Sequence, residues 1–237
     1  MPAAWRIDER ADGASSLHAA WPEVERHPGR RALAVCRVTA PAVVLGSTQA
    51  VTVVDEARCA TSGADVAHRR SGGGAVLVTP EDPVWIDAWV PVGDPLWRSD
   101  VGRAFDWLGD SWVKALGRLG ITGVSAHRGG YVSCTPWSSA VCFGGVGAGE
   151  VVTDDGRKVV GLAQRRNRHG AWLHGACVLR WDPSPLVDLL ALSGEERESA
   201  RAGLAGAVAG ADDLADELGV SGFSGARLTA ALISSLP

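Results

Sequence analysis

The sequence predicts an α+β fold in which a mixed, largely antiparallel sheet is flanked by helices. Short β-branched apolar segments fill the first third of the chain, one helical stripe follows, and a run of strands then gives way to helices. Strands and helices are therefore grouped and do not alternate regularly. We expect a main domain over residues 1–185 and a short helical C-terminal extension over residues 186–237, packed on it.

Composition and charge set the broad class of protein. Of the 237 residues, 46% are hydrophobic and 21% are charged, which excludes a largely disordered chain. The net charge of −4 leaves no basic footprint for nucleic acid. No window reaches the roughly 20 apolar residues of a membrane span, and the start MPAAWRIDER lacks the apolar run of a signal peptide. We expect a cytoplasmic protein that binds neither nucleic acid nor membrane.

Strands are predicted throughout the first third. Residues 32–39 (ALAVCRVT) and 42–46 (AVVLG) are apolar and β-branched, and GSTQ ends the second run. Residues 65–78 predict two short extended pieces on either side of a glycine-rich bend. Residues 84–90 (VWIDAWV), which lie between two prolines, predict a further strand.

A helix follows these strands. Its apolar residues recur every three or four positions, at Val101, Phe105, Leu108, Trp112, Leu116 and Leu119. Ser99 or Asp100 can cap its start, and Gly120 is placed to end it. Lys114 lies off the apolar face, which predicts a solvated side chain.

Residues 141–181 predict an antiparallel meander. Turns at residues 154–156 and 167–170 separate its strands. Polar or aromatic residues inside strands are expected to line the interior or a pocket. His174 and Asp87 fit this description as hydrogen-bonded polar residues, and Trp85 and Trp89 are placed to border an apolar tunnel.

The remainder of the chain is predicted to be helical. Ser184 with Pro185 suits a helix start, and Ser193 with Glu196 forms a capping box for a second helix. The alanine- and glycine-rich stretch at residues 199–218 predicts a weakly packed helical tail.

Five cysteines form an odd set without a CxxC pair, which argues against a disulfide framework and a zinc site. Cys36, Cys59 and Cys177 are predicted to be small core residues. The histidines show no metal-ligand spacing. We expect no metal site and no tightly bound cofactor.

Residues 69–74 (RRSGGG) are the strongest local signal for a binding site. Three successive glycines let the backbone approach a ligand closely, and their N–H groups can form an anion-binding nest. The two arginines suit phosphate or carboxylate oxygens. A flexible hairpin with solvated arginines is the alternative. Neither a GxxxxGKS/T nor a helix-opening GxGxxG nucleotide motif is present.

Lys158 and Cys142 are the candidate reactive residues. Lys158, one of only two lysines, follows a tight turn and begins a strand that would hold it rigidly, and Gly161 would let a substrate lie against that strand. If the meander folds back, the Lys158 ammonium would favour the Cys142 thiolate. The alternatives are a surface lysine on a hairpin and a small core cysteine.

In this order, the motifs resemble the lipoate and octanoate branch of the biotin and lipoate protein ligase family. They are LGSTQ (45–49), RRSGGGAV (69–76), CF…E (142–150), GRKVVGLAQRR (156–166) and LHG (173–175). The resemblance covers about residues 30–185, which would form the catalytic domain. It implies a sheet that holds an apolar slot for an eight-carbon acyl chain.

The resemblance also implies roles for individual residues. Lys158 would contact the acyl carbonyl, where it can stabilise oxyanion charge, and Gln49 would lie near the entrance. The acyl or adenylate group would lie against Arg70, Ser71, Gly72, Gly73, Gly74, Ala75, Gly161 and Ala163.

The leading functional hypothesis is a ligase that makes lipoyl-AMP from lipoate, ATP and Mg²⁺. It would attach lipoate or octanoate to a lysine of a lipoyl carrier domain, in a 2-oxoacid dehydrogenase E2 or a glycine cleavage H protein. The alternative is an octanoyltransferase that draws on octanoyl-acyl carrier protein through a Cys142 thioester. Glu150 and Gln164 also resemble that cysteine-dependent type. A non-catalytic module that binds an acyl ligand is the third hypothesis.

Two departures from the family pattern bear on these hypotheses. Residues 77–80 read LVTP where ligases commonly show His-Asp-Gly, which bears on nucleotide binding. Residues 161–163 read Gly-Leu-Ala in place of Gly-Ser-Ala, which alters the pocket floor. A biotin ligase is disfavoured because its basic motif alternates glycine and arginine.

Overall fold

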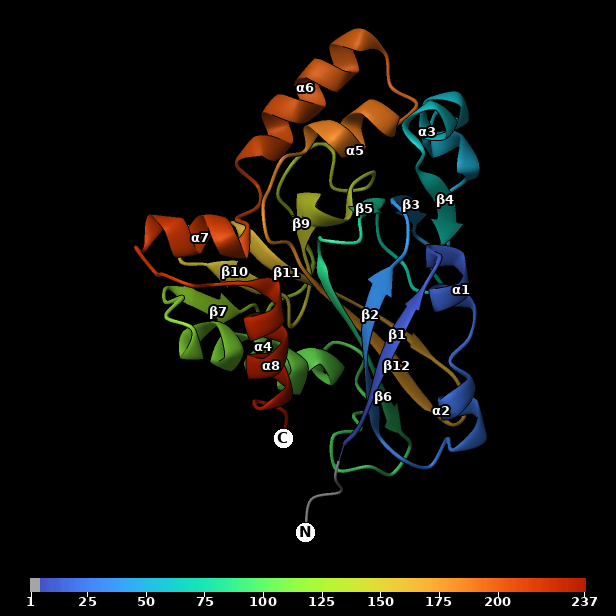
Figure 1. Cartoon of the computed structure of the whole chain (residues 1–237), viewed down its shortest axis with the longest axis vertical. Helices are drawn as coiled ribbons and strands as arrows, with labels where there is room; N and C mark the ends of the chain where they lie inside the picture. The colour runs from blue at the N-terminus through green and yellow to red at the C-terminus, as the bar shows by residue number, and fades with distance from the viewer. Residues whose placement is uncertain (1–4) are drawn as a thin grey trace.

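The computed structural model describes residues 5–237 (Figure 1), so the first four residues of the MPAAWRIDER segment lie outside it. A seven-stranded sheet forms its centre, in the order β1-β2-β6-β12-β11-β10-β7. The strands are β1 (Arg6–Asp12), β2 (Ala32–Val38), β6 (Val84–Pro91), β7 (Val124–Ala126), β10 (Val151–Thr153), β11 (Lys158–Arg166) and β12 (Gly170–Cys177). Only β1 and β2 pair in parallel, and the other neighbours in this sheet are antiparallel. The predicted α+β class with a mixed, largely antiparallel sheet is confirmed, and so is the meander, as β10-β11-β12.

A smaller sheet contains the glycine-rich bend. It has the order β4-β3-β5 and consists of β3 (Ala42–Leu45), β4 (Asp65–His68) and β5 (Val76–Val78). The bend joins β4 to β5, as the sequence predicted. Two further short strands, β8 (Val132–Ser133) and β9 (Gly145–Val146), pair beside it.

Elements on both faces cover the large sheet (Figure 1). One face packs on α4 (Asp106–Arg118), α7 (Ala211–Glu217) and α8 (Gly225–Ile233). The other packs on α1 (Ala14–Ala19), α2 (Pro22–Arg26) and the small sheet. Because successive side chains of a strand point to opposite faces, Ile86 of β6 joins the first core and Trp85 joins the second. The central strand β6 is therefore buried along its whole length.

The structure shortens the helix predicted after Ser99. A 3₁₀ turn over Arg103–Phe105 precedes α4, and Val101 lies before that turn with 57% of its surface exposed. Asp100 accepts hydrogen bonds from two N–H groups of the turn and so caps it. The helical segment ends at Gly120, whose φ of +88° lies in the left-handed region that favours glycine. Lys114 is exposed, as predicted.

The C-terminal helices contribute to the cores. They are α5 (Ser184–Leu189), α6 (Gly194–Ala205), α7 and α8, and α6 begins with both hydrogen bonds of the predicted Ser193–Glu196 capping box. The prediction that residues 199–218 form a weakly packed tail is wrong: Leu204 and Ala211 are fully buried, because apolar residues recur at helical spacing within the short helices. The boundary at residue 185 stays a prediction. Helix α3 (Glu56–Ser62) packs near α5. Within residues 5–237, no helix combines the length and apolar character needed to cross a membrane.

Leu116 of α4 offers a test of the core. Its side chain is fully buried, so Leu116→Ala should lower the free energy of unfolding by about 2–5 kcal/mol. Lys114→Ala, two residues away on the exposed face, should change it by less than about 0.5 kcal/mol. Equilibrium urea unfolding of both variants measures the difference. Equal effects would mean that α4 presents a different face to the sheet.

Candidate active site

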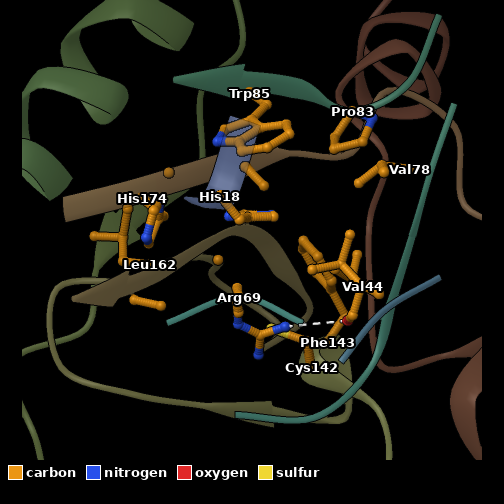
Figure 2. Close-up of a pocket in the computed structure, with 15 residues that line it drawn as sticks. His18, Val44, Arg69, Val78, Pro83, Trp85, Cys142, Phe143, Leu162 and His174 are labelled. Carbon is orange, nitrogen blue, oxygen red and sulfur yellow. Dashed lines mark hydrogen bonds between the residues drawn. The ribbon is translucent and has the colours of Figure 1, made fainter. Parts of the chain in front are cut away.

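An apolar cavity, the inner cavity, lies between the large sheet and the small sheet. Its walls come from β3, β5, β6, β11, β12, α1 and the turn that contains Cys142, and Figure 2 shows their side chains converging on it. The apolar lining consists of Val44, Val76, Val78, Pro83, Trp85, Phe143, Gly161, Leu162, Ala163, Gly175 and Ala176. Such a cavity suits a hydrocarbon chain.

A second, more open hollow adjoins the inner cavity. It is bordered by the glycine turn and by polar residues, among them Gly72, Gly73, Gly74, Tyr131, Glu150, Lys158 and Gln164. Cys142, Leu162 and Ala163 line both spaces. Cys142 is therefore placed where the inner cavity meets the open hollow.

Backbone contacts hold the glycine turn against the Cys142 segment. Ala75 donates its N–H to the Ala140 carbonyl and accepts the N–H of Cys142. Gly73 has φ +104°, and a Cβ on Gly74 would lie 2.6 Å from the Val141 carbonyl carbon. Side chains at these two positions would strain the turn or separate the two segments.

The three glycines also present donors. Among residues 5–237, the N–H groups of Gly72, Gly73 and Gly74 donate no hydrogen bond. All three glycines line the open hollow, and their predicted role in binding an anion or oxyanion stays a prediction.

Other predicted residues support the turn. The Gln49 side chain accepts the N–H of Gly46 at 2.9 Å and donates to the Ala140 carbonyl at 3.1 Å, which links the end of β3 to the Cys142 segment. Ser71 is buried, and its hydroxyl has no hydrogen-bond partner in the part of the chain that the structure describes. Gly161 and Ala163 both line the inner cavity.

The two arginines of the turn point to different places. Arg69 is buried at the inner cavity, where it donates to the carbonyl of Val44 (Figure 2). It also donates to the carbonyls of Gly72 and Gly74. Arg70 is exposed and lines a separate hollow with Trp21 and Arg165. The sequence analysis proposed Arg70 and passed over Arg69. The period-two alternation of β4 was the available signal, because it places Arg69 on the buried side with Ala67.

Lys158 is buried with all three ammonium hydrogens in use. Its Nζ lies 2.7 Å from a Glu150 carboxylate oxygen and 3.0 Å from each of the Cys142 and Gly145 carbonyl oxygens. It also lies over the Phe143 ring, 5.0 Å from the centroid. Burial lowers the pKa of Lys158, but the Glu150 carboxylate outweighs it and the pKa is raised. Lys158 is therefore a fixed cation, and its predicted contact with an acyl carbonyl stays a prediction.

Glu150 joins three parts of the site. Besides Lys158, it accepts the N–H of Leu162 at 2.8 Å and that of Gly147 at 2.7 Å. Its carboxylate thus ties β11 to the loop after Cys142. In the sequence analysis, Glu150 was noted only for its resemblance to the cysteine-dependent octanoyltransferases, and its ion pair with Lys158 was not predicted.

Two histidines also border the inner cavity. His18 of α1 stacks on Trp85 with 4.5 Å between ring centroids. The His174 ring lies edge-on to the His18 ring, with 5.4 Å between their centroids. His174 Nδ1 lies 2.5 Å from an oxygen of the fully buried Asp87, which also accepts the Trp85 indole N–H. Burial lowers the pKa of His18 to about 3, with help from His174. Burial raises the pKa of Asp87, but His174 outweighs it, so the pKa is lowered.

His18 was missed by the sequence analysis because α1 has too few residues for a periodic signal. The other interior predictions have mixed outcomes. Asp87 and His174 line or support the cavity, as expected, and Trp85 borders it, whereas Trp89 lines the separate hollow with Arg70. Cys36, Cys59 and Cys177 are buried.

The site thus combines an apolar cavity, a turn of three glycines and a cysteine that lines both spaces. The family model of the lipoyl protein ligase A/B catalytic domain matches residues 20–236, and the chain belongs to that family. The resemblance predicted from the motifs is confirmed.

Individual relatives agree with this family. The chain is 28% identical over 137 residues to the octanoyltransferase LipM of Clostridioides difficile, a match over 58% of this chain and 49% of the relative, so the matched part spans about half of that protein. A bipartite lipoate protein ligase from Thermoplasma acidophilum, solved in a study with its E2 lipoyl domain, has a TM-score of 0.73 at 19% identity, over 99% of this chain and 82% of that one. A lipoate-protein ligase A bound with ATP has a TM-score of 0.70 at 20% identity, over 99% and 84%.

The Lys158–Glu150 pair predicts strong coupling in stability. Lys158→Met should cost about 3–5 kcal/mol, because it leaves a buried carboxylate without its cation. The double variant Lys158→Met/Glu150→Gln should be more stable than Lys158→Met alone. Urea unfolding of both single variants and the double variant measures the coupling. Strictly additive effects would show that the pair contributes no mutual stabilisation.

The low pKa of the buried His18 predicts that the folded state loses stability in acid. Its folded pKa of about 3 lies below that of an ordinary histidine, 6.5, so between these values the unfolded chain binds a proton that the folded chain excludes. The free energy of unfolding should then fall on acidification by about 1.4 kcal/mol per pH unit. His18→Phe should lack this component. Unfolding midpoints at pH 7, 6 and 5 for both proteins provide the measurement, and parallel slopes would contradict a neutral buried His18.

Proposed function

We propose that this protein transfers a medium-length acyl group to a lysine amine of a lipoyl carrier domain through a thioester on Cys142. The observation that carries the proposal is the position of Cys142, which lines both the inner cavity and the open hollow. An acyl chain in the inner cavity would bring its carbonyl to the sulfur, and the hollow would admit the donor and then the acceptor.

Two displacements make up the reaction. The Cys142 thiol attacks the carbonyl carbon of an acyl thioester and gives its proton to the departing donor sulfur; a carbon–sulfur bond to Cys142 forms, the bond to the donor sulfur breaks, and the donor leaves as a thiol. The neutral carrier lysine then attacks the enzyme thioester, an amide bond forms, the Cys142 sulfur–acyl bond breaks, and a proton from the amine restores the Cys142 thiol. No net oxidation or reduction occurs.

The surrounding groups suit this chemistry. Each displacement places negative charge on the acyl oxygen, and the N–H groups of Gly72, Gly73 and Gly74 offer hydrogen bonds to it. Lys158 supplies a fixed positive charge and binds the Cys142 carbonyl, which holds the nucleophile in place. Because Lys158 keeps its proton, the thiol proton is not transferred to it.

The thioester route is favoured over lipoyl-AMP formation by two observations. Residues 77–80, where ligases commonly carry His-Asp-Gly, are here apolar or uncharged, and Val78 is buried against the inner cavity. The curated relative is an octanoyltransferase. The lipoyl-AMP route with ATP and Mg²⁺ is the second candidate, because the unpaired glycine N–H groups also suit a phosphate.

The partners of the reaction belong to the same proposal. The acceptor would be a lipoyl domain of a 2-oxoacid dehydrogenase E2 or a glycine cleavage H protein, by analogy with the archaeal ligase and its E2 domain. An acyl carrier protein would be the donor. Exposed Tyr131 and Val101 at the open hollow offer apolar contacts to such partners. The reaction would take place in the cytoplasm.

Cys142→Ser tests the thioester directly. With octanoyl-acyl carrier protein and an unmodified lipoyl domain, the wild-type protein should add one octanoyl group to the domain, and intact mass should detect octanoyl on Cys142. Cys142→Ser should lower the rate by about 10³-fold or more. Cys134→Ser, which changes an exposed cysteine, should retain the wild-type rate.

A parallel reaction with lipoate, ATP and Mg²⁺ separates the alternatives. Transfer in this reaction alone, unchanged in Cys142→Ser, would replace the thioester route with the lipoyl-AMP route. Acyl-dependent thermal stabilisation without any mass gain on the carrier would indicate a non-catalytic binding module.

A further inference from the structure

Another hollow, which we call the rear hollow, adjoins the inner cavity. Its walls come from β2, β5, β6, the loop between β5 and β6, and the start of α8, and Cys36, Leu179 and Thr229 are among the residues that border it. The empty space is about 490 Å³ in the inner cavity and about 1140 Å³ in the rear hollow, with the solvent at their openings included. The rear hollow thus has room that the inner cavity lacks.

Three residues border both the inner cavity and the rear hollow. They are Val78, Pro83 and Trp85, and we call them the partition. Within residues 5–237, no residue lines both the rear hollow and the open hollow, which Cys142 borders. Figure 2 shows the partition on the opposite side of the inner cavity from Cys142. The inner cavity therefore has two ends, with Cys142 at one and the partition at the other.

Contacts with neighbouring residues hold the partition in place. Trp85 is only 5% exposed, its indole N–H donates to Asp87 at 2.8 Å, and its ring stacks on His18. Asp82, the neighbour of Pro83, accepts two backbone N–H groups from the segment that follows β12. Because the ring and the loop are both held and the surroundings are close-packed, the wall resists displacement by a longer chain.

A fixed wall limits the length of a chain whose other end is attached to the Cys142 sulfur. Each methylene group that fits between Cys142 and the partition leaves water, which favours the seated chain. Further carbons would overpack the closed end or force the chain back toward the open hollow, and overpacking is destabilising. The partition therefore separates chains that fit the inner cavity from longer ones.

We propose that the partition excludes long acyl chains, and that the rear hollow is the space a longer chain enters when the partition is opened. The inference rests on the proposed function for the attachment of the acyl group at Cys142. It makes Trp85, the largest residue of the partition, a specificity-determining residue for chain length.

A covalent probe tests the partition without any turnover. Octyl and dodecyl methanethiosulfonate each form a mixed disulfide with a thiol and release methanesulfinate, so they fix one end of an alkyl chain at the sulfur. Cys134→Ser removes the exposed competing thiol, and peptide mass then verifies the label on Cys142. We expect the octyl label to raise the melting temperature by about 3 °C or more over the unlabelled protein, and the dodecyl label to raise it by less.

Trp85→Ala in the same background should reverse the order of the two labels, because the dodecyl chain can then extend into the rear hollow. Val78→Ala opens the partition less, so it should narrow the difference between the labels, and it provides the test if Trp85→Ala does not fold. Trp89→Ala is the matched control. Trp89 is a buried tryptophan of the same strand and the same core, but it lines the separate hollow with Arg70, so the order should stay as in the wild type.

The outcomes separate this inference from the proposed function, because the labels report on the partition whether or not the protein transfers an acyl group. A reversed order in Trp85→Ala, found together with no acyl transfer by the wild-type protein, would support the partition and remove the thioester route. Equal shifts for the two labels without a partition substitution would overturn the inference. So would an unchanged order in a Trp85→Ala protein that still unfolds cooperatively, or a reversed order in Trp89→Ala.

Discussion

The Lys158–Glu150 ion pair organises the site, because it ties the Cys142 turn and the loop that follows it to β11. Burying an ammonium is costly unless acceptors surround it, and here two carbonyls of the Cys142 turn and one carboxylate do so. The same carboxylate holds the Leu162 N–H of β11. The contacts that hold the meander together therefore also position the cysteine.

The glycine turn completes this arrangement from the small sheet. Ala75 joins it to the Cys142 segment through two backbone hydrogen bonds, so the small sheet is attached to the large one beside this cysteine. Because Gly74 leaves no space for a Cβ against Val141, the close approach that frees the glycine N–H groups depends on residue type at that position. Gly74 and Ala75 thus determine both how the two segments pack and which N–H groups of the turn stay without a partner.

Features marked by local sequence were predictable, and features set by tertiary contacts were not. The strands, the glycine bend and the Ser193 capping box follow from periodicity and turn chemistry. The early helix start at Val101 was wrong because the Asp100 cap stabilises a 3₁₀ turn first. His18 could not be assigned because its role depends on stacking with Trp85, far along the chain. The buried position of Arg69 could have been predicted from the alternation of side chains along β4.

Both backbone groups of Cys142 are fixed, its N–H by Ala75 and its carbonyl by Lys158. The peptide around the sulfur is thus held on both sides, and the side chain itself can move only by rotation about Cα–Cβ, which has few staggered positions, and about Cβ–Sγ. In the thioester that we propose, the acyl carbonyl would therefore occupy few positions. A carrier domain would have to bring its amine to one of them.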